Sequence, residues 1–176
     1  MKRLTMLALA LSVFTAGCDE VLSPATPTGQ ITLVSQLSGA QEVPAAAAPE
    51  AAAAGSLSVT MVPAGGGGYT ASFTFQVAGL VGAGVFPAPL DSGSVIVAGH
   101  IHQGAAGVVG PPVVALPISQ AAPIVSPTGG VRLTISNVAV TADAANAILA
   151  NPAGFYFNLH SAFNPAGVVR GQLVKQ

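Results

Sequence analysis

The chain has 176 residues, of which only 6% are charged, and its formal net charge at pH 7 is −1. Ordinary soluble domains carry about 25% charged residues, so this composition favours an exported or envelope protein over a cytosolic one. No cluster of lysine and arginine occurs between Arg3 and Arg132. The sequence therefore excludes a nucleic-acid-binding surface, which needs a basic stripe to neutralise phosphates.

The N-terminal segment is expected to be a signal peptide over residues 1–17. It begins with MKR and continues with the apolar stretch LTMLALALSVFTAG, a pattern typical of export signals. The stretch is shorter than the roughly 20 apolar residues that a comfortable membrane span needs. Cys18 follows directly and is the only cysteine of the chain, so it cannot form an internal disulfide.

The stretch that ends at Cys18 resembles a bacterial lipobox, in which the cysteine is lipidated after cleavage. Thr15 departs from that pattern, because leucine is commonest at its position. The alternative is an ordinary signal peptide followed by an incidental cysteine. We expect a lipid on Cys18 to anchor the exported protein to a membrane of the cell envelope, facing outside the cytoplasm. Residues 18–30 are then a tether to the folded domain.

Short period-two runs of apolar and polar residues occupy most of the chain from residue 31 onward. Glycine, proline and asparagine separate these runs, as in antiparallel sandwiches and barrels. The alanine-rich stretch from Pro44 to Gly55 is interrupted by proline and is predicted to be a loop. The sequence thus predicts one all-β domain over residues 31–176, an antiparallel, Greek-key-like β-sandwich with one short helix. The runs are ITLVSQLSG, GSLSVTMVP, YTASFTFQVAGL, SVIVAGHIH, GPPVVALPI, GVRLTISNVAV, GFYFNLH and GVVRGQLV.

The one segment that reads as a helix is TADAANAILANPAG. Thr141 is suited to cap its N-terminus, and the charge of Asp143 in the first turn complements the helix dipole. Asn151 should end the helix, because the following Pro152 disfavours the helical conformation at the preceding residue. Its buried stripe is expected to be Ala144, Ile148 and Leu149.

Three sequence blocks follow one another along the chain: LSGAQEVP (Leu37–Pro44), AGHIHQGAAGVVGPPVV (Ala98–Val114) and GFYFNLHSAFNPAGVVRGQL (Gly154–Leu173). Together with the helix between the last two, they resemble the chordin (CHRD) domain, a module of animal chordins and of many bacterial exported proteins. The insert VGAGVFPAPLDSGS before the histidine pair looks longer than usual. The resemblance implies an all-β extracellular domain and, with the export signal, a bacterial exported lipoprotein. It implies no defined biochemical role.

The histidines are the main candidates for chemistry. His100 and His102 lie two residues apart in a predicted strand, so their side chains should share a face. His160 should share a face with Tyr156 and Asn158, opposite the apolar residues of GFYFNLH. We expect the three histidines to converge. Imidazole nitrogens suit zinc and copper, so they form a candidate three-nitrogen metal site.

The histidine pair also resembles the His-Val-His strand of copper/zinc superoxide dismutase. That enzyme needs further histidines and an aspartate, so a complete dismutase centre is excluded here. The other interpretation is a structural polar cluster, in which the histidines hydrogen-bond to backbone carbonyls and to Asn158 or Glu42.

Glu42 and Arg170 are among the few charged residues of the domain and are expected to pair. In one interpretation they form a structural ion pair that ties the N-terminal strand to the C-terminal hairpin. In the other they support the metal ligands or recognise a ligand, with Asn158 as a further polar neighbour.

Two functions remain open on this reading. The first is a non-enzymatic envelope module for binding or adhesion, whose protein or glycan partner the sequence does not name; no serine nucleophile or paired-carboxylate constellation stands out. The second is an envelope protein that binds copper or zinc through His100, His102 and His160, with redox activity left open.

Overall fold

The computed structural model of the chain describes residues 29–84 and 93–176. The predicted signal peptide, Cys18 and all but the end of the tether lie outside these ranges, as do residues 85–92 of the insert. Among the described residues, no helix has the length and apolar character that a membrane crossing requires.

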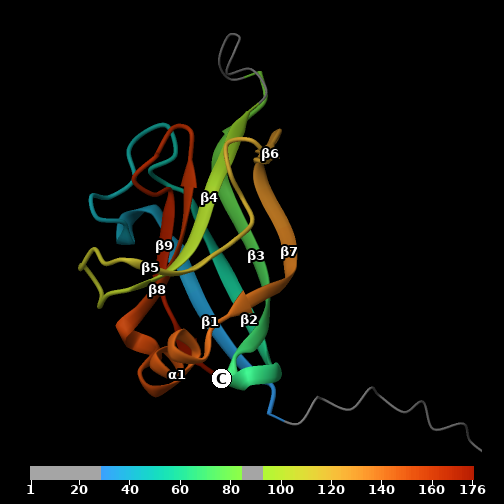
Figure 1. Cartoon of the computed structure of the whole chain (residues 1–176). Coiled ribbons are helices and arrows are strands. Elements are labelled where there is room, and N and C mark those ends of the chain that lie inside the picture. The colour runs from blue at the N-terminus through green and yellow to red at the C-terminus, as the bar shows by residue number, and fades with distance from the viewer. Residues whose placement is uncertain (1–28, 85–92) are drawn as a thin grey trace, which may run out of the picture.

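Ten antiparallel strands form one sheet that curls into a nearly closed barrel, with α1 at one end beside the C-terminus (Figure 1). The strand order is β5-β4-β8-β9-β1-β2-β3-β7, with β10 beside β1 and β6 beside β4. The prediction of an all-β, antiparallel fold with one short helix is confirmed. The strands are β1 (Ile31–Ser38), β2 (Ala54–Pro63), β3 (Tyr69–Gly82), β4 (Ser94–Gln103), β5 (Pro112–Ala115), β6 (Ile124–Ser126), β7 (Thr128–Val140), β8 (Phe155–Ser161), β9 (Val169–Gln172) and β10 (Val174–Lys175).

The core lies inside the barrel and is centred on three phenylalanines. Phe73 and Phe75 of β3 each lie 6.1 Å from Phe157 of β8, measured between ring centroids, and all three are buried. Successive residues of a strand point to opposite faces of a sheet. Strand β8 therefore supplies the core with every second residue and turns the residues between them to the outer face.

The predicted helix is present as α1 (Ala142–Ala150). The side chain of Thr141 caps it by accepting a hydrogen bond from the backbone N–H of Ala144 at 3.3 Å. Ile148 is buried, and Ala144 and Leu149 pack against the core. Ala145, which was not part of the predicted stripe, is also fully buried. The helix thus closes one end of the barrel through Ile148 and Ala145, with Ala144 and Leu149 only partly buried.

Two connections leave the sheet and extend on the same side of the barrel (Figure 1). After β1 comes a short 3-10 turn, η1 (Gly39–Gln41), and then a loop that lasts until β2 begins at Ala54, which matches the loop predicted from Pro44. The second connection, residues 104–111, joins β4 to β5. Two further 3-10 turns, η2 (Gly65–Gly67) and η3 (Pro152–Gly154), lie in other connections.

Candidate metal centre

The register of the strands gathers the candidate residues on the outer face of β4, β8 and β9. Directly opposed residues on one face of an antiparallel sheet have Cβ atoms about 4.5–5.5 Å apart. His160 pairs with Ala98, two residues before His100, so it lies beside the first of the two rows of polar residues that cross these strands. Its ring also comes near the second row, with its centroid 6.4 Å from that of His102. The two rows are His100–Asn158–Arg170 and His102–Tyr156–Gln172.

The structure brings the three histidines together. The ring centroid of His100 lies 5.3 Å from that of His102 and 5.2 Å from that of His160. One nitrogen from each ring can be chosen so that all three atoms lie within 4.8 Å of one another. Nδ1 of His100 and Nε2 of His160 are 3.3 Å apart. Two nitrogens bound to one tetrahedral zinc ion are also about 3.3 Å apart, given bond lengths of about 2.05 Å.

Two backbone carbonyls fix the orientation of two of these rings. Nδ1 of His102 lies 2.8 Å from the carbonyl oxygen of Gly110, and Nδ1 of His160 lies 3.0 Å from that of Pro165. A carbonyl only accepts hydrogen bonds, so each Nδ1 carries the proton and each Nε2 keeps its lone pair. Without a metal, Nε2 of His160 accepts a hydrogen bond from Nδ1 of His100, whereas Nε2 of His102 has no partner among the described residues. Metal-binding histidines are commonly held in this way through the ring nitrogen that does not bind the metal.

Nε2 of His102 is buried and has no hydrogen-bond partner among the described residues. Such an atom loses its contact with water without gaining another, which costs free energy. A metal ion at the centre of the cluster would supply the missing partner.

The surroundings of His100 and His102 disfavour the charged form of both side chains. Burial, followed by the neighbouring His160 and His102, lowers the pKa of His100 from 6.5 to about 4. Burial also lowers the pKa of His102, although its hydrogen bond to Gly110 opposes the shift. Only a neutral imidazole can bind a metal ion, so these two side chains are in their ligand form at neutral pH.

A stack of side chains lies behind His102. The ring of Tyr156 stacks on His102 with centroids 4.9 Å apart and an angle of 7° between the planes. On the Tyr156 ring, in turn, lies the guanidinium of Arg170, whose Cζ is 3.4 Å from the centroid. The stack fixes the plane of a candidate ligand, and the sequence pattern alone did not indicate it.

The buried Arg170 holds the connection 104–111 over this stack. Its Nη2 donates hydrogen bonds to the carbonyl oxygens of Ala105 at 2.8 Å and Val108 at 2.9 Å. Gln172 donates to the carbonyl oxygen of Gly104 at 3.0 Å. A Cβ atom on Gly110 would lie 1.6 Å from the Gln103 carbonyl oxygen. Only glycine therefore fits where this connection turns back to place its carbonyl against His102.

Glu42 lies close to Arg170 but in an environment that disfavours its charge. Burial raises its pKa to about 7, although Arg170, a hydrogen bond from Asn158 and the backbone N–H of Val43 oppose the shift. Among the described residues, the hydrogen bonds of Arg170 go to the loop carbonyls and to Gln172, and its interaction with Glu42 is electrostatic. The carboxyl group packs directly on the backbone of Gly167, where a Cβ atom would lie 2.3 Å from the Glu42 Cδ.

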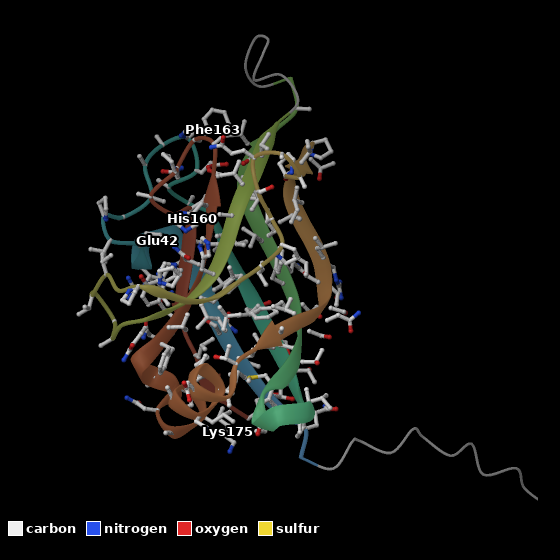
Figure 2. All side chains as sticks on the ribbon, viewed as in Figure 1. Glu42, His160, Phe163 and Lys175 are labelled. Atoms are coloured by element: carbon white, nitrogen blue, oxygen red, sulfur yellow. The ribbon has the colours of Figure 1, made fainter. Side chains whose placement is uncertain are left out.

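Asn158 connects Glu42 to the histidines. Its hydrogen bond lowers the pKa of Glu42, and it pairs with His100 across the sheet. Its Oδ1 is buried and has no hydrogen-bond partner within the described ranges. Asn158 is thus the shared neighbour of the charged pair and of the candidate ligands. In Figure 2 the labelled Glu42 and His160 lie on the same side of the molecule, away from the end that carries Lys175.

A further buried acid, Glu50, was not anticipated from the sequence. It is 0% exposed and accepts hydrogen bonds from the hydroxyls of Ser94 and Ser161, both at 2.5 Å, and from Nδ2 of Asn164 at 3.0 Å. These bonds tie the long loop after β1 to β4 and to the turn after β8. The isolated acid in PAAAAPEAAAAG was the one available signal. Glu50 thus helps to position the loop after β1 and the turn after β8, which lie near the candidate metal centre.

Comparison with known proteins gives one match. Searches of curated proteins and of solved structures find nothing similar to the chain. A model of the CHRD domain, however, matches residues 33–173. This range contains the whole site and all strands except the first two residues of β1 and the short β10. On this match, the chain belongs to the CHRD domain family.

Proposed function

We propose that this protein binds one copper or zinc ion through His100, His102 and His160. The observation that carries the proposal is the buried Nε2 of His102, which has no hydrogen-bond partner in the part of the chain that the structure describes. It lies in a cluster of three imidazoles whose nitrogens come within 4.8 Å of one another. The carbonyls of Gly110 and Pro165 orient two of the rings. A purely structural cluster would be expected to satisfy that nitrogen.

The composition of the cluster favours these metals. Its ligands are three half-buried imidazoles, and no carboxylate or thiolate belongs to the group in the described part of the chain. Imidazole suits zinc and copper, whereas magnesium, calcium and manganese prefer oxygen ligands. Three protein ligands leave the fourth position of a tetrahedral ion to water or to an exchangeable ligand.

The test is metal binding by tag-free protein. Isothermal titration with zinc and, under anaerobic conditions, with copper(I) should give one ion per chain. Replacing any one ligand, for example His160→Gln, should abolish stoichiometric binding. Gln76→Ala on the exposed face of β3 is the control and should bind as the parent does. Failure of the parent to bind either metal, or full binding by His160→Gln, would overturn the proposal.

The same chain is proposed to work as an exported, lipid-anchored and non-enzymatic binding module. The support is the apolar signal followed by Cys18 in the sequence and the membership of the CHRD domain family. In this role the domain holds a ligand outside the cytoplasm and needs no catalytic group. The partner of such a module can be a protein or a glycan.

A further inference from the structure

A cavity of about 200 Å³ is lined in part by Arg170, whose guanidinium lies on the Tyr156 ring behind His102 of the candidate metal centre. One wall comes from residues 40–43, in and just after η1, and the facing wall is Ala106 and Gly107 of the connection 104–111. Arg170 and Gln172 of β9 complete the lining. None of the three histidines lines this cavity, so it is a separate site.

Two nearly buried charged side chains line the cavity with unused hydrogen-bonding groups. Glu42 is 6% exposed, and its Oε1 has no hydrogen-bond partner in the described part of the chain. Arg170 is 2% exposed, and its hydrogen bonds to described residues all leave from Nη2. A guanidinium has five N–H donors, so donors remain for a ligand.

Gln41 adds a second acceptor at the cavity. Its Nε2 donates to the Gln36 carbonyl oxygen and to the Ser38 hydroxyl, both at 3.1 Å. This use of the amide nitrogen leaves the amide oxygen of Gln41 to accept a hydrogen bond. The side chains that line the cavity therefore include two with an acceptor, Glu42 and Gln41, and one with remaining donors, Arg170.

We infer that this cavity binds a neutral polyhydroxylated molecule, such as the terminal unit of a saccharide. Each hydroxyl both donates and accepts a hydrogen bond. Neighbouring hydroxyls can donate to Glu42 and Gln41 while another accepts from Arg170. A cationic ligand would be placed against Arg170 and an anionic ligand against Glu42, and like charges at close range are unfavourable. Arg170 therefore disfavours a cationic ligand, and Glu42, where it is ionised, disfavours an anionic one, so a ligand without net charge is favoured.

The rim of the cavity suits the C–H surface of a sugar ring. Val43, which lines the cavity, is 38% exposed, and Val108, next to Gly107, is 52% exposed. No aromatic ring is part of the described lining, so one sugar unit lacks a stacking platform. Affinity for a single unit should be weak, in the millimolar range.

The inference names a ligand class for the proposed binding module and does not depend on the metal. The experiment is a titration of isotope-labelled, purified full-length protein followed by backbone amide NMR shifts. The probes are glucose, galactose and N-acetylglucosamine as neutral sugars, with glucosamine as the cationic analogue and gluconate as the anionic one. Zinc binding is measured separately on the same sample, so loss of one activity does not imply loss of the other.

The expected result is a saturable shift of Gln41, Gly107 and Gln172 with at least one neutral sugar and none with the charged analogues. Glu42→Gln should weaken binding several-fold. Ala106→Leu should abolish it by filling the cavity, and Ala121→Leu, an exposed alanine outside the lining, should leave it unchanged. Shifts with glucosamine or gluconate alone, no shift with any probe, or unchanged binding in Ala106→Leu would overturn the inference.

Discussion

At the scale of single residues, His100 makes the stability of the metal-free protein depend on pH. Its pKa is about 4 in the folded protein against 6.5 as the ordinary value. Between these values the unfolded chain binds a proton that the folded chain does not. The contribution of His100 is therefore fully present above pH 6.5 and is lost as the pH falls toward 4. Urea unfolding of metal-free protein at several pH values measures this.

Glu42 contributes a pH dependence of the opposite sign, and its variant serves as the control. Its pKa of about 7 lies above the ordinary 4.5, so its contribution is fully present below pH 4.5 and is lost as the pH rises through 7. With Glu42→Gln as background, only the acid-side loss should remain. Adding His100→Gln should reduce that loss and leave the part due to His102, whose pKa burial also lowers; parallel profiles with and without His100→Gln would contradict the assignment.

The buried Arg170 is expected to matter more for stability than Glu42. Arg170→Met removes the hydrogen bonds to Ala105 and Val108 and the contact with Tyr156, and it leaves Glu42 without its neighbouring cation. A loss of about 3–5 kcal/mol in the free energy of unfolding is expected. Glu42→Gln should cost less, because burial already disfavours the carboxylate.

A double-mutant cycle tests whether the two residues are coupled. Urea unfolding of Arg170→Met, Glu42→Gln and the double variant gives the three free energies. Coupled residues should give a double loss smaller than the sum of the single losses. A strictly additive result would show that Glu42 and Arg170 do not interact.

At the scale of elements, the connection 104–111 is predicted to control the metal site from outside it. Gly110→Ala would place a Cβ atom 1.6 Å from the Gln103 carbonyl oxygen, so the backbone must move and its carbonyl must leave His102. Loss of such a supporting hydrogen bond typically lowers metal affinity about 10–100-fold. Zinc titration checks this, with Gly65→Ala as the control, since a Cβ atom there meets nothing within 4 Å. Equal affinity in both variants would contradict the prediction.

The strands and the faces of the site could be predicted from the sequence because alternation along a strand is a local property. GFYFNLH shows directly that His160 lies opposite the apolar face. The register of β4 against β8 is not local, since it depends on pairing between segments about 60 positions apart, as the His100–His160 contact illustrates. Which ring nitrogens face one another was therefore not predictable.

The supporting contacts were even less accessible to sequence reasoning. The carbonyls of Gly110 and Pro165 orient the rings of His102 and His160. Every residue has a backbone carbonyl, so the sequence does not show which carbonyl makes such a contact. Arg170 was predicted to pair with Glu42, but its hydrogen bonds go to carbonyls of a loop whose path the sequence does not specify. The small number of charged residues was enough to single out Glu42 and Arg170. The hydrogen-bond partners of Arg170 depend on the path of the connection 104–111.

At the scale of the whole molecule, the proposed anchor concerns a residue outside the described structure. We predict that Cys18 is the lipidated first residue of the mature protein, because it stands at the small-residue end of the apolar signal. Metabolic labelling with a clickable fatty acid should mark the parent and not Cys18→Ser. Equal labelling of both would contradict lipidation at this position. Ser23→Ala, in the predicted tether, is the matched control and should label as the parent does.

Strand β8 limits where insertions and deletions can be tolerated as the sequence evolves. Its seven residues alternate between the barrel interior and the outer face, so the same short segment carries Phe157 for folding and His160 for the candidate ligand set. A slip of one residue would exchange these roles. An insertion in β8 would therefore disturb both the core and the candidate ligand set. A longer connection between β3 and β4 would leave the pairing of β8 with β4 and β9 unchanged. Inherited variation in length should therefore accumulate between β3 and β4 and be rare within the block from Gly154 to Leu173.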